Sequence, residues 1–538
     1  MEAAGLVEAH RCEGGAIVEG AAAVNAAATE SGVRGNCGDF ETATLSLLGK
    51  SPAILLPAMA SVPLFRTLPV ANPRTGIADY HIEPLDAPAV DALALRLRKA
   101  QPAWAALSLD SRLEVLGAFV TALGDHGAAI VAALASDTGR RTIAGVELDG
   151  VKGMVARWTR EAPGLVQGIT GTRIATALPG VTAGTRLHPY PLVGIISPWN
   201  FPLTLALIDA IPALVAGCAV IVKPSEVTPR FIRPLMAAIA SVPALASVFA
   251  VIEGDGDTGA ALVGAVDYIA FTGSVATGRK VALAAAAAFI PASLELGGKD
   301  PMIVLASADP ADASAIALRA SVVATGQACQ SIERVYVARA IHDEFLAHLV
   351  TRASAVTLNH PDISNGEIGP FIFARQAEIV AGQIADAVAK GATVQCGGVI
   401  EDHGGKWLRP TVITGITPDM IVMTDETFGP VIPVIPFDTV DEAVALANAG
   451  SFGLSAAVLA GTVAEAEAVA ERLHAGAVSI NDGALTSIIG DAEKTSWGLS
   501  GLGPSRMGAS GLLRFFRRQA LLRQQGTPLP LAAYAERG

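Results

Sequence analysis

Short apolar segments alternate with helical patterns through most of the chain, and this alternation constrains the fold more than any other feature. A first series of strands is expected at residues 193–197, 219–222, 249–253, 268–272 and 302–305. A second series is expected at residues 334–337, 393–396, 431–437, 455–459 and 478–481. Strands separated by helices predict an α/β fold with parallel sheets. We therefore expect two α/β units in series, divided near Gly297.

The first part of the chain differs from this pattern. Residues 1–60 are rich in Ala, Gly and Glu and show little periodicity, which predicts a disordered extension. An alternative is that translation starts at Met59. The first residues lack a basic region followed by an apolar core, so a secretory signal is not expected. Further on, helical spacing of apolar residues predicts helices at 89–105 and 111–134, and alternation predicts a hairpin at 171–189 that turns near residue 180.

Composition excludes several classes of protein. The formal net charge is −12, without a block of Lys or Arg, which argues against a nucleic-acid partner. The five cysteines are scattered and show no metal-like pairing, which indicates a reduced, cytoplasmic protein with no metal site. The longest apolar run, residues 203–222, contains Asp209 and Pro212. It predicts a buried helix followed by a buried strand rather than a membrane span.

Residues 254–259 match the pattern G-x-G-x-x-G between an expected strand and an expected helix. No acidic residue follows at the distance needed to hold a ribose, and Asp255 and Asp257 place negative charge where a pyrophosphate would bind. A glycine-rich turn from strand to helix is therefore the favoured interpretation, although Gly256 stays a candidate for cofactor binding.

Two other segments give better nucleotide signals. Gly273 and Ser274 follow an expected strand, and Ser274 can cap a helix whose free N–H groups attract phosphate. The alternative is an ordinary helix cap. Lys223, Ser225 and Glu226 follow a buried strand, where Lys and Glu can both hold ribose hydroxyls. The alternative is an exposed ion pair. A carboxylate at residue 226 would repel a 2′-phosphate and so favours NAD over NADP.

Three residues could support the oxidation of a carbonyl compound through a thioester. Cys329 could be the nucleophile, because a thiolate is strongly nucleophilic; a core thiol is the alternative, which we assign to Cys218. Asn200 could donate to the oxyanion, or be a turn residue. Glu295 lies in an otherwise uncharged segment, where burial would raise its pKa and suit it as a base; a partnered buried carboxylate is the alternative.

Late in the chain, residues 426–430 read Glu-Thr-Phe-Gly-Pro. The carboxylate of Glu426 can bind a second ribose, and the ring of Phe428 can pack beside a nicotinamide. The alternative is a turn with a core phenylalanine.

In this order the motifs resemble the NAD(P)-dependent aldehyde dehydrogenases, from about residue 65 to residue 525. The resemblance rests on residues 271–274, 295–299, 326–329 with Arg334, and 426–430. It implies oxidation of a small-molecule aldehyde to the acid, with NAD and possibly NADP as cofactor. Catalytic roles are implied for Cys329, Glu295 and Asn200. The implied cofactor site comprises Trp199, Lys223, Ser225, Glu226, Gly256, Gly273, Ser274, Leu296, Glu426 and Phe428.

The resemblance also implies a domain plan and an assembly. Residues 61–295 would bind the nucleotide and residues 296–510 would carry the cysteine. The hairpin at 171–189 and a last strand near 512–522, within a C-terminal part at 511–538, would join subunits into a homodimer or homotetramer.

Three departures from the family pattern indicate an atypical subgroup. Asp209 stands where many members have a lysine, Ala324 replaces a usual Asn, and residues 496–499 replace a common Pro-Phe-Gly-Gly. Thr204, Ala328, Gln330 and Ser331 are modest in size near the expected pocket, and Asp209 argues against a small acidic semialdehyde, so a bulky or aromatic aldehyde is expected. Two other functions are left open: acyl transfer to coenzyme A, and a binding protein without activity. The presence of Glu295 argues against the first, and the complete set of three residues argues against the second.

Overall fold

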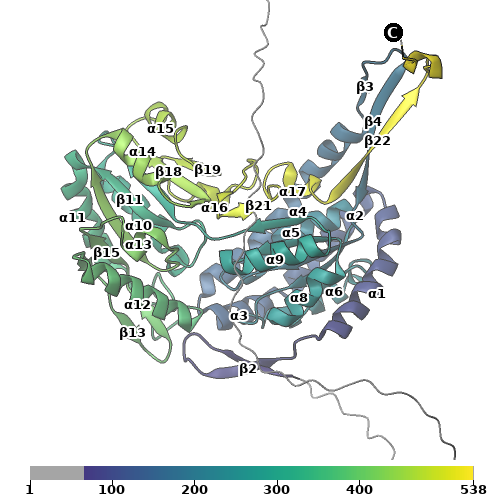
Figure 1. The fold of residues 1–538 in the computed structure, drawn as a ribbon. Coiled ribbons are helices and arrows are strands. Elements are labelled where there is room, and N and C mark those ends of the chain that lie inside the picture. Colours follow the sequence, from purple (N-terminus) through teal and green to yellow (C-terminus); the bar gives the residue numbers. More distant parts are fainter. Residues whose placement is uncertain (1–65, 537–538) are drawn as a thin grey trace, which may run out of the picture. The chain divides into compact units, whose positions relative to one another are not determined.

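Two sheets organise the computed structural model, which describes residues 66–536 (Figure 1). The extension predicted for residues 1–60 lies outside the described residues. The first sheet has the order β21-β9-β8-β5-β6-β7 and is parallel apart from the edge strand β21. Its strands are β5 (Leu192–Ile196), β6 (Ala219–Lys223), β7 (Phe249–Val251), β8 (Tyr268–Thr272), β9 (Ala292–Glu295) and β21 (Gly501–Leu502).

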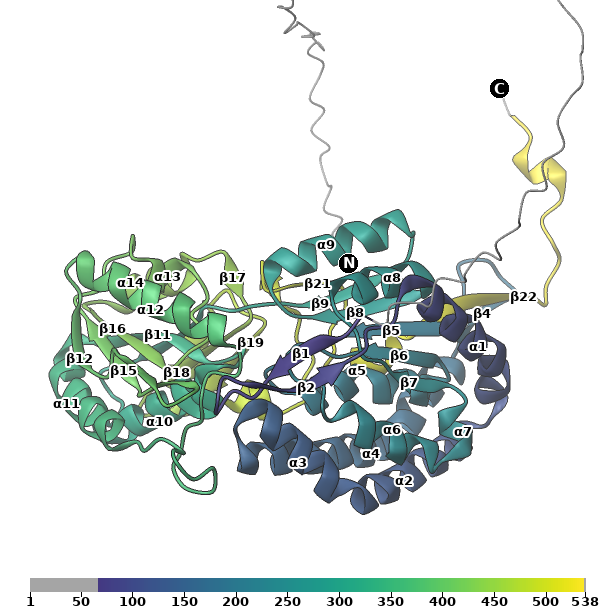
Figure 2. The same ribbon diagram turned by 90° about the horizontal axis from the view of Figure 1, so that it is seen from below.

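The strands of this first sheet are buried because helices cover them. β6 and β8 are buried along their whole length and β5 along nearly all of its length, as is typical of parallel strands. Helices α5, α8 and α9 flank the sheet (Figure 2). The helices of this part are α5 (Pro202–Ala216), α6 (Ile232–Ala240), α7 (Pro243–Ala246), α8 (Gly256–Ala265) and α9 (Val275–Ala287). The buried helix and strand predicted for residues 203–222 are confirmed.

The second sheet has the order β12-β15-β16-β11-β10-β18-β19 and is parallel apart from the edge strand β12. The α/β fold with parallel-type sheets is therefore confirmed. Its strands are β10 (Asp300–Val304), β11 (Ile332–Ala338), β12 (Thr393–Cys396), β15 (Thr411–Thr414), β16 (Val431–Phe437), β18 (Ser455–Leu459) and β19 (Ala477–Ile480). Its helices are α10 (Pro310–Val322), α11 (Arg339–Ala355), α12 (Ala374–Ala389), α13 (Ile421–Thr424), α14 (Val440–Asn448) and α15 (Val463–Ala470).

The chain crosses between the two sheets twice. It leaves the first sheet at Glu295, the end of β9, and enters the second at Asp300, the start of β10. It returns when β21 pairs with β9 and places Gly501 opposite Glu295. Residues expected to belong to the second unit thus complete the edge of the first sheet. This pairing holds the residues around β21 close to Glu295.

A third sheet has three antiparallel strands in the order β22-β4-β3. Its strands are β3 (Arg173–Ala175), β4 (Val181–Pro189) and β22 (Phe516–Gln524), and Figure 1 shows β22 alongside β4. The hairpin predicted at 171–189 is confirmed. The last strand starts at Phe516 rather than near residue 512, because Ser510–Leu513 forms a short helix, α17, that packs on α5.

The helices that precede the first sheet also differ from expectation. The single helix expected at 111–134 is two helices, α2 and α3, bent by 67°. They meet at His126, which lies between Gly124 and Gly127, and glycine is a poor helix former. The elements of this part are β1 (Leu68–Ala71), β2 (Ala78–Ile82), α1 (Ala87–Ala106), α2 (Leu109–Asp125), α3 (Gly127–Thr138) and α4 (Arg141–Thr170).

Within residues 66–536 no single helix is long and apolar enough to cross a membrane, although α2 and α3 taken together pass a test of length and composition. The remaining short elements are η1 (Val323–Gly326), β13 (Ile400–Asp402), β14 (Lys406–Leu408), β17 (Phe452–Gly453), α16 (Leu485–Ile488), β20 (Trp497–Gly498) and η2 (Leu531–Tyr534).

Candidate active site

Two adjoining cavities form a groove along the carboxyl ends of β5, β6 and β8. One, of about 410 Å³, contains the thiol, and the other, of about 570 Å³, extends away from it. The first is bordered by Asn200, Leu296, Cys329, Glu426 and Phe428, among others. The second is bordered by Lys223, Ser225, Glu226 and Gly256, and both by Trp199, Gly273 and Ser274. Of the predicted site residues, Glu295 alone borders neither cavity.

The loop before Cys329 has an unusual backbone. Ala324, Thr325 and Gly326 have φ of 57°, 62° and 66°, a region that costs energy for residues with a side chain. Hydrogen bonds hold this conformation: Thr325 Oγ1 donates to the Gly369 carbonyl at 3.0 Å. A Cβ on Gly326 would lie 2.4 Å from the backbone of Gly429, so a glycine is required there. The surrounding chain therefore fixes the position of Cys329.

Asn200 lies directly against this loop. Its side chain is buried, and its Nδ2 donates to the Gln327 carbonyl at 3.0 Å. An amide nitrogen carries two hydrogens, so one remains for a ligand. Arg140 joins the two segments, because its guanidinium donates to the carbonyls of both Asn200 and Ala324. The structure thus brings Asn200 and Cys329 together, as the sequence predicts.

Glu147 supports the helix that follows Asn200. Its Oε2 accepts from the N–H groups of Leu203 and Thr204, in the first turn of α5, at 3.0 Å each. Burial raises the pKa of Glu147 to about 7. This carboxyl group satisfies N–H groups that a helix leaves without a partner at its start, and so anchors the end of α5 that carries Asn200.

Glu295 ends β9 beside the thiol. Its side chain is half-buried, and Ser496 Oγ donates to its Oε2 at 3.1 Å. The burial expected for a base is therefore only partial. The charge of Glu295 nevertheless acts on Cys329, so the two side chains share one electrostatic environment.

The thiol lies in surroundings that disfavour its ionised form. Burial by the surrounding protein raises the pKa of Cys329 to about 11, although its side chain keeps some exposure. Three carboxyl groups act in the same direction, those of Glu426, Glu295 and Asp300, and Lys494 opposes them. Cys218 is fully buried and its thiol donates a hydrogen bond to the Phe515 carbonyl, as expected for a core thiol.

The loop with Glu426 and Phe428 is fixed by a buried ion pair. Lys299 Nζ lies 2.7 Å from Glu333 Oε2 and 2.8 Å from Thr427 Oγ1. The Glu333 carboxylate also accepts from the N–H groups of Thr427 and Phe428 at 2.8 Å. Nearby, the ring of Phe428 packs edge-on against Trp199 with centroids 5.3 Å apart.

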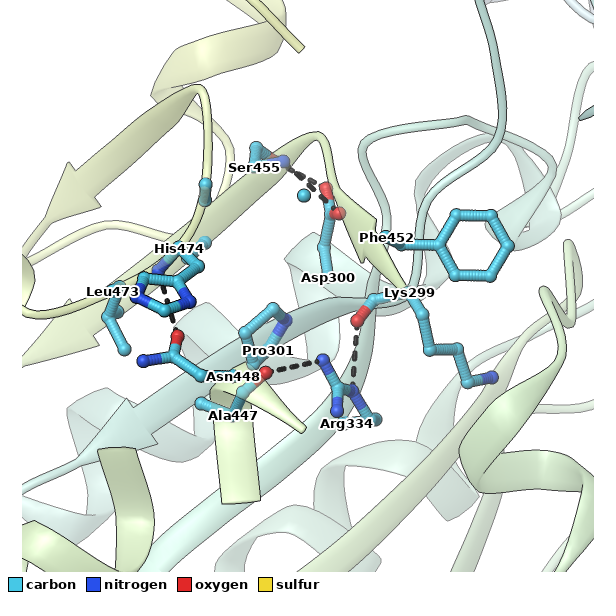
Figure 3. A pocket seen from close by; sticks show the side chains of 13 residues that line it. Lys299, Asp300, Pro301, Arg334, Ala447, Asn448, Phe452, Ser455, Leu473 and His474 are labelled. Atoms are coloured by element: carbon cyan, nitrogen blue, oxygen red, sulfur yellow. Dashed lines mark hydrogen bonds between the residues drawn. The ribbon is translucent and has the colours of Figure 1, made fainter. Parts of the chain in front are cut away.

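Glycines bring the Glu426 carboxyl group close to the backbone. The Gly298 N–H donates to Glu426 Oε1 at 3.2 Å, and a Cβ on Gly297 would lie 2.6 Å from Oε2. Burial, followed by the charge of Glu333, raises the pKa of Glu426 to about 8. Arg334 fastens the next residues, since its Nε donates to the Lys299 carbonyl at 2.9 Å (Figure 3).

The second cavity contains the predicted nucleotide residues. Lys223 Nζ donates to the carbonyls of Gly254 and Asp255 at 3.2 Å and to Glu226 at 3.4 Å. Ser274 caps α9 by accepting from the Thr277 N–H at 3.3 Å. Asp255 caps α8, which supports the interpretation of residues 254–259 as a turn from strand to helix.

Asp209 is far more enclosed than the sequence suggests. It is fully buried and pairs with Arg506 at 2.8 Å and with Arg514. Burial alone would raise its pKa, but the two arginines outweigh that effect and hold the pKa below its usual value. Because its charge is neutralised and it borders neither cavity, the argument from Asp209 against an acidic semialdehyde is wrong.

Comparison with known proteins decides the family. A model described as the aldehyde dehydrogenase family matches residues 61–521. The chain belongs to the aldehyde dehydrogenase family. It is therefore an enzyme that oxidises an aldehyde to a carboxylic acid with NAD or NADP, through a cysteine thioester.

Individual aldehyde dehydrogenases resemble the chain over most of its length. A protein of Mycolicibacterium smegmatis, provisionally named an NADP+ succinate-semialdehyde dehydrogenase, is 36% identical over 80% of this chain and 84% of its own. The 4,4'-diapolycopene aldehyde oxidase of a Methylomonas species is 36% identical over 84% of each. Among solved structures, the provisionally named aldehyde dehydrogenase PutA of Anabaena variabilis is 49% identical with a TM-score of 0.84, covering 87% of this chain and 99% of its own. Betaine aldehyde dehydrogenase of Staphylococcus aureus with NAD+ is 28% identical with a TM-score of 0.81, covering 88% and 96%.

Several residues around the aldehyde dehydrogenase site are not found by reasoning from the sequence. Arg140, Glu147 and Lys494 belong to no motif recognised in the sequence, and Ser496 begins the segment 496–499, whose departure from the family pattern assigns it no role. The sequence offers one weak hint of Arg140, because this residue follows Gly139, a glycine whose positive φ ends the helix. The others become visible only when the two sheets are brought together.

Proposed function

We propose that Cys329 is the nucleophile of this enzyme, Asn200 the oxyanion donor and Glu295 the base. The observation that carries the proposal is that Cys329, Asn200 and Gly273 border one cavity while Glu295 acts on the thiol from beside it. The thiolate attacks the aldehyde carbon, and the resulting oxyanion accepts from the Asn200 amide and the Cys329 N–H. A nicotinamide cofactor held in the groove beside Trp199, Gly273 and Phe428 would supply the acceptor for the hydride that this adduct loses.

The thioester formed on Cys329 is then hydrolysed. Glu295 takes a proton from water, and the hydroxide adds to the thioester carbon. Collapse of this second tetrahedral adduct breaks the C–S bond, which releases the carboxylic acid and returns the thiolate. The Ser496 hydroxyl orients Glu295 by donating to Oε2, and leaves Oε1 to accept the proton.

The experiment compares wild type with Cys329→Ala, supplying aldehyde and nucleotide with and without coenzyme A. We expect NADH formation to fall at least about a thousandfold while nucleotide binding, measured by fluorescence quenching, is retained. Comparable turnover in the variant contradicts the assignment. A rate that requires coenzyme A indicates acyl transfer instead of hydrolysis.

We propose that NAD is preferred over NADP. The groove fits a dinucleotide, because it places Lys223 and Glu226 at the end of β6 and the unpaired N–H groups of the α9 start near Ser274. The Glu226 carboxylate borders the same cavity 3.4 Å from Lys223 Nζ, where its negative charge would repel a 2′-phosphate. The name of the M. smegmatis relative specifies NADP+, which makes kcat/KM with both cofactors the deciding measurement.

We propose a bulky, uncharged aldehyde as substrate. Beside the predicted cofactor residues, the cavity that contains the thiol is bordered by the apolar side chains of Leu205, Phe373 and Ile379. The names of two relatives specify succinate semialdehyde and 4,4'-diapolycopene aldehyde, so the panel contains succinate semialdehyde and bulky uncharged aldehydes. A higher kcat/KM with succinate semialdehyde than with benzaldehyde or a long-chain aldehyde would contradict the proposal.

We also propose the division into residues 61–295 for nucleotide binding and 296–510 for the cysteine, and an assembly through the third sheet. The strand β22 lies at an edge of that sheet and exposes Leu522, which supports contact with a second copy. Light scattering of the purified chain should show a dimer or tetramer; a monomer contradicts it. A cytoplasmic location stays a prediction from the scattered cysteines.

A further inference from the structure

Lys494 is a buried cation for which the proposed mechanism has no use. Its side chain is only 7% exposed, and its Nζ has no hydrogen-bond partner among residues 66–536. Lysine is rarely buried without a partner, because removing an ammonium from water is costly. The buried ammonium of Lys494 would be stabilised by an anion that forms at some stage of the reaction.

The backbone holds Lys494 beside the reacting groups. It lies between α16 and β20, and its N–H donates to Ser505 Oγ at 3.4 Å. Two residues later Ser496 bonds to Glu295, and β21 then pairs with the strand that ends at Glu295. The segment with Lys494 is therefore fastened to the strand that carries the proposed base.

The charge of Lys494 reaches the thiol. The charge of Lys494 acts on both Cys329 and Asp300. These two residues are neighbours, because a Cβ on Gly298 would lie 2.7 Å from both Asp300 Oδ1 and the Cys329 carbonyl. A cation whose charge acts on both of these neighbours belongs to the surroundings of the cysteine.

Among the residues that the structure describes, no carboxylate pairs with Lys494. Asp300 accepts from the N–H and the hydroxyl of Ser455, as Figure 3 shows, and Glu295 accepts from Ser496. Glu426 accepts from the Gly298 N–H.

The charged groups that face Cys329 are thus Glu295 on β9, Asp300 on β10, Glu426 on its loop, and the cations Lys494 and Arg506. Arg506 pairs with Asp209, so Lys494 is the cation without an anion among these groups.

We infer that Lys494 is a positioning residue for catalysis, whose ammonium stabilises the thiolate of Cys329. The inference rests on the proposed role of Cys329 as nucleophile. When the proton leaves Sγ, the new negative charge forms among three carboxyl groups, and Lys494 supplies the opposing charge. Its effect is greatest before the aldehyde binds and when the C–S bond of the thioester breaks, since Sγ is anionic at both stages.

The experiment measures the alkylation of Cys329 by iodoacetamide as a function of pH in the full-length enzyme. Peptide mass spectrometry separates Cys329 from the other four cysteines. We expect Lys494→Met to raise the pH at which alkylation is half-maximal, its midpoint, by about one pH unit. Alkylation at pH 8 should then be about tenfold slower, because one pH unit is a tenfold change in the ionised fraction of the thiol. Lys494→Arg should restore the midpoint.

The matched control is Lys406→Met, which removes the same charge from an exposed lysine paired with Asp402. Its midpoint should equal that of wild type. A wild-type midpoint in folded Lys494→Met, or an equal shift in Lys406→Met, overturns the inference. Lys494→Gln, checked by circular dichroism, serves as a second neutral variant if the methionine variant is not recovered folded, and the same outcomes apply to it.

Alkylation requires no turnover, so this result is independent of the proposed function. If Cys329→Ala keeps NADH formation, the proposed nucleophile is wrong whatever the midpoint of Lys494→Met. If Cys329→Ala is inactive and the midpoint does not move, only the role of Lys494 is wrong.

Discussion

The two ends of the groove are built in different ways. At the nucleotide end, each polar side chain directly follows the strand that places it: Lys223 ends β6, and Ser274 comes two residues after the end of β8. At the thiol end, the loop before Cys329 accepts hydrogen bonds from Asn200 and Arg140, which lie more than a hundred residues away along the chain. The nucleotide end is local in sequence, whereas the reactive end exists only in the folded molecule.

The two ends also differ in how they treat charge. In the nucleotide cavity the Lys223 ammonium has three partners. Around the thiol, by contrast, burial raises the pKa of Asp300 to about 7 and that of Glu426 to about 8. The reactive end therefore contains groups near their point of ionisation, which is typical of catalytic sites.

The variant with the largest expected effect is Glu295→Gln, which changes the reactive end of the groove. We expect steady-state NADH formation to fall about 10²–10³-fold, because a positioned base typically contributes that much, while the first turnover stays fast. Stopped-flow absorbance should show a burst of NADH followed by slow turnover, since the thioester forms but is hydrolysed slowly. The control is Ser496→Ala, which keeps the carboxylate and loses one hydrogen bond, and should be less impaired. A first turnover as slow as the steady state would assign Glu295 to an earlier step.

Arg140→Leu tests whether the reactive end depends on distant contacts. The variant removes the donor that joins the carbonyls of Asn200 and Ala324, so the oxyanion donor and the cysteine loop can shift apart. We expect kcat to fall about a hundredfold, the typical effect of misplacing reacting groups by about 1 Å. The dissociation constant for NAD, measured by calorimetry, should change less than twofold. If only the affinity for NAD fell, Arg140 would support the nucleotide end of the groove instead of the thiol end.

The same difference explains what the sequence predicts and what it does not. Strands such as β8 and the cap at Ser274 follow from local apolar pattern and turn chemistry, and both were expected at these residues. The surroundings of Asp209 were not, because its partners Arg506 and Arg514 come from the far end of the chain. The break at His126 was missed since the apolar spacing continues across it. Pairing over long distances leaves no periodic signal.

Glu226→Gln tests the nucleotide end. Loss of the carboxylate removes repulsion of a 2′-phosphate and releases one N–H of Lys223 from its 3.4 Å contact. We expect the ratio of kcat/KM for NADP to that for NAD to rise about tenfold, the equivalent of about 1.4 kcal/mol. Asp257→Asn is the matched control, because it removes an exposed carboxylate that borders the same cavity. An equal rise in the control would attribute the preference to overall charge instead of to Glu226.

The smallest expected effect is on stability, with Glu426→Gln. The folded-state pKa of Glu426 is raised to about 8 by burial, whereas that of an unfolded glutamate lies near 4.3. Below both values the carboxyl group is neutral in both states and costs nothing. Between them the unfolded state ionises first, so wild type loses stability as the pH rises, and the loss levels off above about pH 8.

Glutamine keeps the acceptor for Gly298 N–H and removes the ionisation. In scanning calorimetry its Tm should exceed that of wild type by a margin that grows from pH 5 to about pH 8 and then stays constant, at about 1–2 °C. A difference in Tm between Glu426→Gln and wild type that does not change with pH would mean that the reactive end does not hold this carboxyl group neutral.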